Sequence, residues 1–218
     1  MMKNSVNDEW IELASNKDRL YNHIQTTLTA HKQKSFIYKE GPSTPAAVLI
    51  PLFFKENQAH ILFTKRTTYV GTHKGQISFP GGKRDETDPN LQFTALRETH
   101  EEVGIEVGDV NILGKTDLFL TNSDFLVTPF VGSFEFPYKY QPSEDEIEEI
   151  IEVPLIHLLD KRIFRIKKIT RYGYYWHIHY YDYNTHVIWG VTGFLLSNFL
   201  SIIFGMKRDS FPEIETAS

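Results

Sequence analysis

Apolar residues near the N-terminus recur at spacings of three, four and seven positions, which is typical of a helix with one buried stripe. We therefore predict a single helix over residues 7–31. The stripe consists of Trp10, Ile11, Leu13, Leu20, Tyr21, Ile24 and Leu28. A connection over residues 32–44 follows and ends at the turn signal Gly41-Pro42.

The rest of the chain mixes apolar runs of strand length with segments of helical spacing. The runs predict strands over 46–54, 59–64, 76–79, 110–120, 126–136, 164–170, 174–181 and 186–189. Helical spacing predicts helices over 91–103, 155–159 and 193–204. The acidic residues 143–153 are expected to be part loop and part short helix or strand. Because some strands form hairpins and others are separated by helices, we expect a layered α/β or α+β fold with a mixed sheet.

Composition narrows the classes of partner. A length of 218 residues suits one domain with a sizeable core, and a net charge of -5 argues against a nucleic-acid partner. The absence of cysteine excludes disulfides, thiolate metal sites and a cysteine nucleophile, and fits the reducing cytoplasm. The most apolar late segment, residues 194–206, is shorter than the roughly 20 apolar residues that span a bilayer, so we expect no membrane partner.

Three carboxylates provide the candidate chemistry. Glu98, Glu101 and Glu102 are spaced i, i+3 and i+4, which places them on one face of the predicted helix 91–103. Their mutual repulsion costs about 0.2–0.5 kcal/mol per pair on an exposed helix, and a cation among them would turn that cost into binding. Carboxylate oxygens suit a hard ion such as Mg2+ or Mn2+. The alternative interpretation is an acidic helix face that is only solvated.

The sequence around these glutamates reads Arg97-Glu98-Thr99-His100-Glu101-Glu102-Val103-Gly104-Ile105. It resembles the signature of the Nudix hydrolase family, in which a Gly and a Glu precede Arg-Glu-apolar-any-Glu-Glu-any-Gly-apolar. Thr99 takes the apolar position here. Five residues separate Gly82 from Asp88, which stands where the signature has its first Glu, and eight residues rather than the signature's seven separate Asp88 from Arg97. Whether Asp88 replaces that Glu is left open.

The resemblance implies a Nudix-type α/β/α sandwich with a mixed β-sheet over residues 35–218, preceded by an N-terminal helical extension over residues 1–34. It also implies metal-dependent hydrolysis of a diphosphate bond, with Glu98, Glu101 and Glu102 as ligands of Mg2+ or Mn2+ and Glu101 among the catalytic residues. Arg97 is expected to orient a helix glutamate through an ion pair.

A longer upstream stretch looks like the coenzyme A diphosphatase branch of this family. Thr64 and Arg66 match it, as does the segment from Gly75 to Gly82, whereas Gly71 stands where that branch usually has Arg. The expected contacts of the substrate phosphates come from cations and from glycine backbone, which a ligand can approach closely. These residues are Arg66, Lys74, Gly81, Gly82 and Lys83.

The resemblance implies hydrolysis of coenzyme A or acyl-CoA to 4'-phosphopantetheine, or its acyl form, and adenosine 3',5'-bisphosphate. The general base is open between a signature glutamate and the later carboxylates Glu146 and Glu149. Two rival functions are a diphosphatase for ADP-ribose or a dinucleotide, and a non-catalytic nucleotide-binding module. The amphipathic N-terminal helix and the aromatic strands near the C-terminus also suggest a homodimer.

Overall fold

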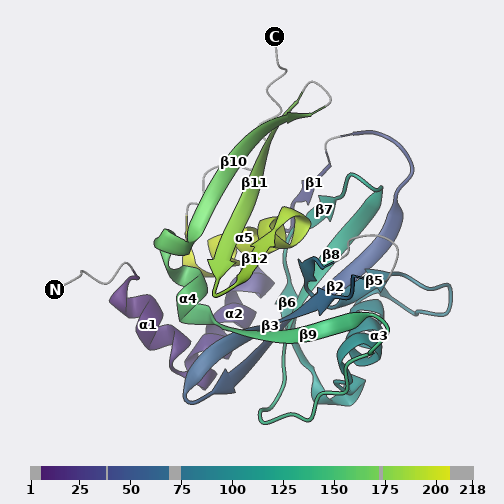
Figure 1. The fold of residues 1–218 in the computed structure, drawn as a ribbon. Coiled ribbons are helices and arrows are strands. Elements are labelled where there is room, and N and C mark those ends of the chain that lie inside the picture. The colour runs from purple at the N-terminus through teal and green to yellow at the C-terminus, as the bar shows by residue number, and fades with distance from the viewer. Residues whose placement is uncertain (1–5, 38, 69–74, 172–173, 207–218) are drawn as a thin grey trace.

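The computed structural model describes residues 6–37, 39–68, 75–171 and 174–206 (Figure 1). The helices in these ranges are α1 (Asp8–Ala14), α2 (Lys17–Ala30), α3 (Leu91–Val103), α4 (Leu155–Leu159) and α5 (Gly190–Phe204). The strands are β1 (Ser35–Phe36), β2 (Thr44–Lys55), β3 (Gln58–Arg66), β4 (Ile77–Ser78), β5 (Gly81–Lys83), β6 (Asn111–Lys115), β7 (Leu118–Leu120), β8 (Phe125–Ser133), β9 (Ile147–Pro154), β10 (Phe164–Arg171), β11 (Tyr174–Tyr183) and β12 (His186–Trp189). No helix in the described part of the chain has the length and apolar character needed to cross a bilayer.

The main sheet is mixed. Its central order is β1-β7-β8-β2-β3-β4, with β5 on β2, β6 on β8 and β9 on β3. The pairs β2–β8 and β1–β7 are parallel, and the other pairs are antiparallel. The strands β10, β11 and β12 form a separate antiparallel sheet, which stands beside α5 in Figure 1.

The hairpin of β2 and β3 follows directly from its turn. Glu56 and Asn57 both have positive φ, at 52° and 57°, and Lys55 pairs with Gln58 across them. Two residues of positive φ form the turn that matches the natural twist of a hairpin, and Asn tolerates this conformation well. The predicted hairpin is therefore confirmed.

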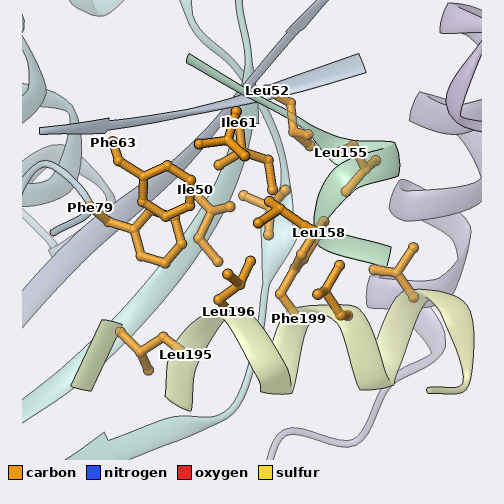
Figure 2. Close-up of a cluster of buried hydrophobic side chains, with 14 of the residues drawn as sticks. Ile50, Leu52, Ile61, Phe63, Phe79, Leu155, Leu158, Leu195, Leu196 and Phe199 are labelled. Atoms are coloured by element: carbon orange, nitrogen blue, oxygen red, sulfur yellow. The ribbon is translucent and has the colours of Figure 1, made fainter. Parts of the chain in front are cut away.

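Strand β2 is buried on both faces and carries two core layers. Ala47 and Leu49 pack on one face in a cluster with Ala95 of α3. Ile50 and Leu52 point to the opposite face, where Figure 2 shows them among side chains of α4 and α5. The labelled residues of this layer are Ile50, Leu52, Ile61, Phe63, Phe79, Leu155, Leu158, Leu195, Leu196 and Phe199. Helices thus cover both faces of the sheet, and the predicted α/β/α sandwich with a mixed sheet is confirmed.

The single N-terminal helix expected over residues 7–31 is wrong, because α1 and α2 are separate helices. Asn16 breaks the chain between them in an extended conformation, and its side chain accepts a hydrogen bond from the Arg19 N–H at 3.0 Å. This is an N-cap, the role that Asn favours most. The buried stripe continues through Ala14 and Leu20 on either side of the break, so apolar spacing alone does not show it. The proposed division into residues 1–34 and 35–218 stays a proposal.

The strand predicted over residues 110–120 is also wrong as one element, since β6 and β7 pair with β8 on either side of a gap. Pro129 of β8 lies opposite this gap. Because proline has no N–H, Pro129 cannot donate a hydrogen bond to the gap residues, and it only accepts one, from the Thr116 N–H to the Pro129 carbonyl. Asp117 lies in this gap, is buried, and contacts residues of two distant segments, Asn198 of α5 and His31 at the end of α2. Its carboxylate accepts from Asn198 at 2.9 Å and lies 2.7 Å from His31 Nε2.

Candidate active site

Helix α3 has the bounds that the sequence predicts, because both of its ends carry specific signals. The Asn90 side chain accepts a hydrogen bond from the Phe93 N–H at 2.9 Å and caps the first turn. Gly104 ends the helix in the left-handed conformation at φ 77°, with its N–H bonded to the His100 carbonyl. Ala95 and Thr99 face the sheet and are fully buried. The helix also packs against β5, which sets the position of its glutamates.

Glu102 is the most buried of the three glutamates, at 4% exposure. Its Oε1 lies 3.3 Å from Arg66 Nη1, whereas its Oε2 has no hydrogen-bond partner among the described residues. Burial is the main cause that raises the pKa of Glu102 to about 8; the charges of Glu98 and Glu146 add to the rise, while Arg66 and the backbone N–H of Gly81 oppose it. A buried carboxylate oxygen with no partner needs a cation or a proton.

Glu98 lies directly against the β5 backbone. A Cβ atom placed on Gly82 would be 2.5 Å from the Glu98 carboxylate, closer than any side chain can approach. Burial also raises the pKa of Glu98, and the charges of Glu101 and Glu146 contribute, while Arg97 opposes them. Gly82 is therefore required to leave room for this carboxylate.

Arg97 is held by a buried aspartate. Its Nε lies 2.9 Å from Asp88 Oδ1 and its Nη2 lies 3.0 Å from Asp88 Oδ2, the two-pronged geometry that Arg and carboxylate favour. Asp88 is 1% exposed and also accepts from Thr94 and from the Asp85 N–H. The Arg97 guanidinium holds the pKa of Asp88 well below its usual range. Asp88 thus anchors Arg97, and its equivalence to the first Glu of the family signature stays a proposal.

The third guanidinium nitrogen of Arg97, Nη1, contacts two of the glutamates. This nitrogen lies 3.0 Å from Glu98 Oε1 and 2.9 Å from Glu101 Oε2. Glu101 is the outermost of the three, with 55% of its side chain exposed. These contacts agree with the expectation that Arg97 orients helix glutamates, and the role itself stays a proposal.

Arg66 makes the second bridge of the site. It lies at the end of β3, with Nη1 near Glu102 and Nη2 3.0 Å from Glu146 Oε2. Glu146, just before β9, therefore belongs to the same acidic group. Glu149 is directed to His186 instead, with Oε1 3.4 Å from His186 Nε2. Of the two later carboxylates proposed as bases, Glu146 is the one that the structure brings to α3.

The proposed phosphate contacts lie on two strands and one undescribed segment. Gly81 pairs with Val48 at a φ of 155°, and a Cβ there would be 2.4 Å from the Ala47 carbonyl, so only glycine lets β5 pack on β2. Lys83 ends β5 with an exposed side chain, while its carbonyl oxygen lies 3.4 Å from Arg97 Nη2. Lys74 lies outside the described residues.

The carboxylates of the site are not preassembled as a metal site. No group of three His, Asp or Glu side chains in the described ranges has ready metal-ligand geometry, and arginine nitrogens contact Glu98, Glu101 and Glu102. The chemistry of the donors nevertheless fits a hard ion, since all are carboxylate oxygens and Glu102 Oε2 is buried without a partner.

A cavity of about 940 Å³ adjoins this site. Its lining includes Arg66, Gly81, Gly82 and Lys83, residues of β2, β7 and β8, and residues of β10, β11, β12 and α5, whereas none of the glutamates described above lines it. Sequence reasoning missed the contribution of β10, β11 and β12, because the aromatic residues 174–189 were interpreted as strands that pack on each other. The available signal was their alternation, which leaves one of the two strand faces free to line a cavity.

The family model and the curated relatives of this chain point to one family. The family model described as NUDIX domain matches residues 43–172. The mouse protein named peroxisomal coenzyme A diphosphatase NUDT7 is 34% identical over 67% of this chain and 62% of its own length, less than two thirds of that protein. An uncharacterized Nudix hydrolase NudL from Enterobacter is 38% identical over 74% of this chain and 83% of its own. A C. elegans Ap4A hydrolase structure aligns with a TM-score of 0.48 and 16% identity, over 75% of this chain and 99% of that one.

Proposed function

Because the chain belongs to the Nudix hydrolase family, we propose that it hydrolyses the diphosphate bond of coenzyme A or acyl-CoA. The products are 4'-phosphopantetheine, or its acyl form, and adenosine 3',5'-bisphosphate. The observation that carries this proposal is the buried Oε2 of Glu102, which has no hydrogen-bond partner among the described residues, while Arg66, which contacts Glu102, lines the adjoining cavity.

The cofactor that fits the donors is Mg2+ or Mn2+, held by Glu98, Glu101 and Glu102. When bound, it neutralises charge on the phosphate oxygens and lowers the pKa of a water molecule. Mg2+ in particular takes one or two carboxylates together with substrate phosphates. This matches a group in which only part of the oxygens is free of arginine.

The chain's own residues position the reaction. Asp88 fixes Arg97, and Arg97 orients Glu98 and Glu101. Arg66 holds Glu102 next to Glu146, and Lys74 and Lys83 are the proposed partners of the substrate phosphates.

In the proposed reaction, the oxygen of a water molecule attacks one phosphorus atom. The bond from that phosphorus to the bridging oxygen breaks, and the second phosphate leaves with the bridging oxygen. The water proton passes to a carboxylate. Glu101 and Glu146 are the candidates for that base within the acidic group, whereas Glu149 lies near His186 and outside this group.

The substrate assignment has two supports. The upstream stretch around Arg66 and Gly75 to Gly82 looks like the coenzyme A diphosphatase branch, and the name of the mouse relative gives that activity to that protein. ADP-ribose and dinucleotides remain the rival substrates, and a binding module without turnover is the rival function.

The test is a substrate panel of coenzyme A, acyl-CoA, ADP-ribose and a dinucleotide, with and without Mg2+ or Mn2+, with products identified by mass spectrometry. We expect metal-dependent release of adenosine 3',5'-bisphosphate from coenzyme A, and a strong loss in Glu101→Gln. Turnover of ADP-ribose with coenzyme A untouched refutes the substrate, and binding without product in either metal refutes the enzyme.

The cytoplasmic location and the homodimer remain proposals, as does the absence of a nucleic-acid or membrane partner. Cell fractionation and light scattering address the first two. The name of the mouse relative places that protein in the peroxisome, so a peroxisomal fraction is the specific alternative to look for.

A further inference from the structure

Arg66 lies between the acidic group and the cavity. Its Nη1 is 3.3 Å from Glu102 Oε1, and its Nη2 is 3.0 Å from Glu146 Oε2. Arg66 also lines the cavity, whose lining among the described residues contains the further cations Lys83 and Lys167 and no Asp or Glu. The same guanidinium can therefore pair with the carboxylates of the protein or with an anion in the cavity, but not fully with both.

The other arginine of the site is fixed more firmly. Arg97 is anchored from outside the glutamates by the buried Asp88, which contacts its Nε at 2.9 Å and its Nη2 at 3.0 Å. Among the described residues, the hydrogen bonds and ion pairs of the Arg66 guanidinium are those with Glu102 and Glu146. Arg66 thus lacks a buried anchor of the kind that Arg97 has, and it is the arginine that can change partners.

Arg66 and a metal ion compete for Glu102. This glutamate is 4% exposed, Arg66 contacts its Oε1, and its Oε2 has no hydrogen-bond partner among the described residues. A divalent cation at Glu102 would place two positive charges beside the guanidinium, and like charges repel strongly where little water screens them. A diphosphate in the cavity would give Arg66 another anion, since arginine pairs with phosphate in the same two-pronged geometry as with carboxylate.

We propose that Arg66 couples metal binding to diphosphate binding by exchanging partners. It pairs with Glu102 and Glu146 before the substrate binds and turns to the phosphates when the substrate enters. The exchange makes both carboxylates available together, Glu102 as a metal ligand and Glu146 as the candidate base. The proposal rests on the proposed function, because it takes the acidic group as the metal site. By linkage, the diphosphate raises the affinity for the metal, and the metal raises the affinity for the diphosphate by the same factor.

The test measures binding without turnover in the full-length protein by calorimetry. The probes are Mn2+ alone, methylenediphosphonate alone in the presence of EDTA, and Mn2+ with methylenediphosphonate. The equilibrium between Mn2+ and the diphosphonate in buffer is measured separately and included in the fit. Without diphosphonate, Arg66→Gln should bind Mn2+ about 5-fold more tightly than the wild type or better, because a competing cation is gone. The same variant should bind the diphosphonate more weakly, and its coupling factor should fall well below the wild-type factor, expected at about 5- to 150-fold.

Two variants serve as controls. Lys65→Gln makes the same change of charge at the neighbouring residue of β3, whose Nζ lies 2.6 Å from Glu148 Oε1, and it should match the wild type in all three titrations. Arg66→Lys keeps the charge and should stay nearer the wild type than Arg66→Gln in both affinities. A role of Arg66 in folding alone would not raise one affinity and lower the other.

Two outcomes overturn the proposal. One is an affinity of Arg66→Gln for Mn2+ alone that is no higher than that of the wild type. The other is an equal coupling factor in the two proteins, which makes Arg66 a fixed contact. The proposed function fails separately, because none of these titrations needs turnover: a protein that shows the exchange and cleaves no member of the substrate panel refutes the hydrolysis and leaves the role of Arg66 standing.

Discussion

Replacing Asp88 with Asn tests how the site is held together. The substitution keeps the size of the side chain and removes its charge. Asp88 Oδ1 accepts from Arg97 Nε, and Oδ2 accepts from Arg97, from Thr94 and from the Asp85 N–H. An amide has only one oxygen, so its NH2 group must face donors in one of these two positions.

The expected cost follows from burial. Asp88 is 1% exposed, and breaking one partner of a buried ion pair costs about 3–5 kcal/mol. We expect about 3 kcal/mol, the lower end of that range, because Arg97 keeps its contacts with Glu98 and Glu101. Activity should fall as well, since the guanidinium that orients both glutamates loses its anchor.

Urea unfolding followed by tryptophan fluorescence measures the free energy of unfolding of both proteins. Asp85→Asn is the matched control, because Asp85 lies in the same loop, is exposed and bonds through its side chain to Thr87. It should unfold like the wild type. If Asp88→Asn also unfolds within error of the wild type, Arg97 is not held by Asp88 and the site must be explained differently.

The free energies of unfolding of wild type and Asp88→Asn should also differ in their dependence on pH. The pKa of Asp88 is held below its usual range, so its stabilising effect is complete above about pH 4, the ordinary value for Asp, and is lost as the pH falls further. The difference in stability between wild type and Asp88→Asn should therefore narrow below pH 4. A difference that stays constant down to pH 2 would mean that the ionised carboxylate is not its source.

Three further predictions concern the acidic group. Because burial raises the pKa of Glu102 to about 8, metal-free protein should lose stability as the pH rises from about 4 towards 8. In unfolding curves Glu102→Gln should reduce this loss and leave only the part due to Glu98, whose pKa is also raised, and Mg2+ should stabilise the wild type more than the variant at pH 8. Gly82→Ala should displace the Glu98 carboxylate, which its Cβ would meet at 2.5 Å, and weaken Mn2+ binding measured by calorimetry. If Glu146 is the general base, Glu146→Gln should lower kcat by about 10²–10⁴ and Glu149→Gln by much less; equal losses contradict the choice between them.

The parts of the structure that the sequence predicted are those fixed by local signals. The bounds of α3 follow from a capping Asn90 and a left-handed Gly104, both adjacent to the helix in the chain. The β2–β3 hairpin follows from Glu56 and Asn57 at its turn. Asn16 carries the same kind of local signal, but it lies inside a continuous apolar stripe that predicts one helix across it.

The parts that the sequence did not predict depend on contacts between distant residues. Arg66 and Glu102 are 36 positions apart, and nothing in the pattern of either segment predicts their ion pair. The break between β6 and β7 depends on Pro129 in a later strand. The cavity wall depends on which face of β11 meets α5: the backbone of Gly193 packs so closely on β11 that a Cβ there would be 2.4 Å from the His179 carbonyl. Alternation predicts that a strand has two faces and leaves undetermined what each face contacts.

The charge balance of the site is the physical reason to expect a cation despite the two arginines. Each guanidinium contacts more than one carboxylate: Arg66 contacts two and Arg97 contacts three. The group contains five carboxylates and two guanidiniums, so three negative charges remain when all are ionised. The carboxylates are Asp88, Glu98, Glu101, Glu102 and Glu146, and the guanidiniums are Arg66 and Arg97. Burial raises the pKa of Glu102, the charges of Glu98 and Glu146 add to the rise, and a divalent ion bound there would offset both effects.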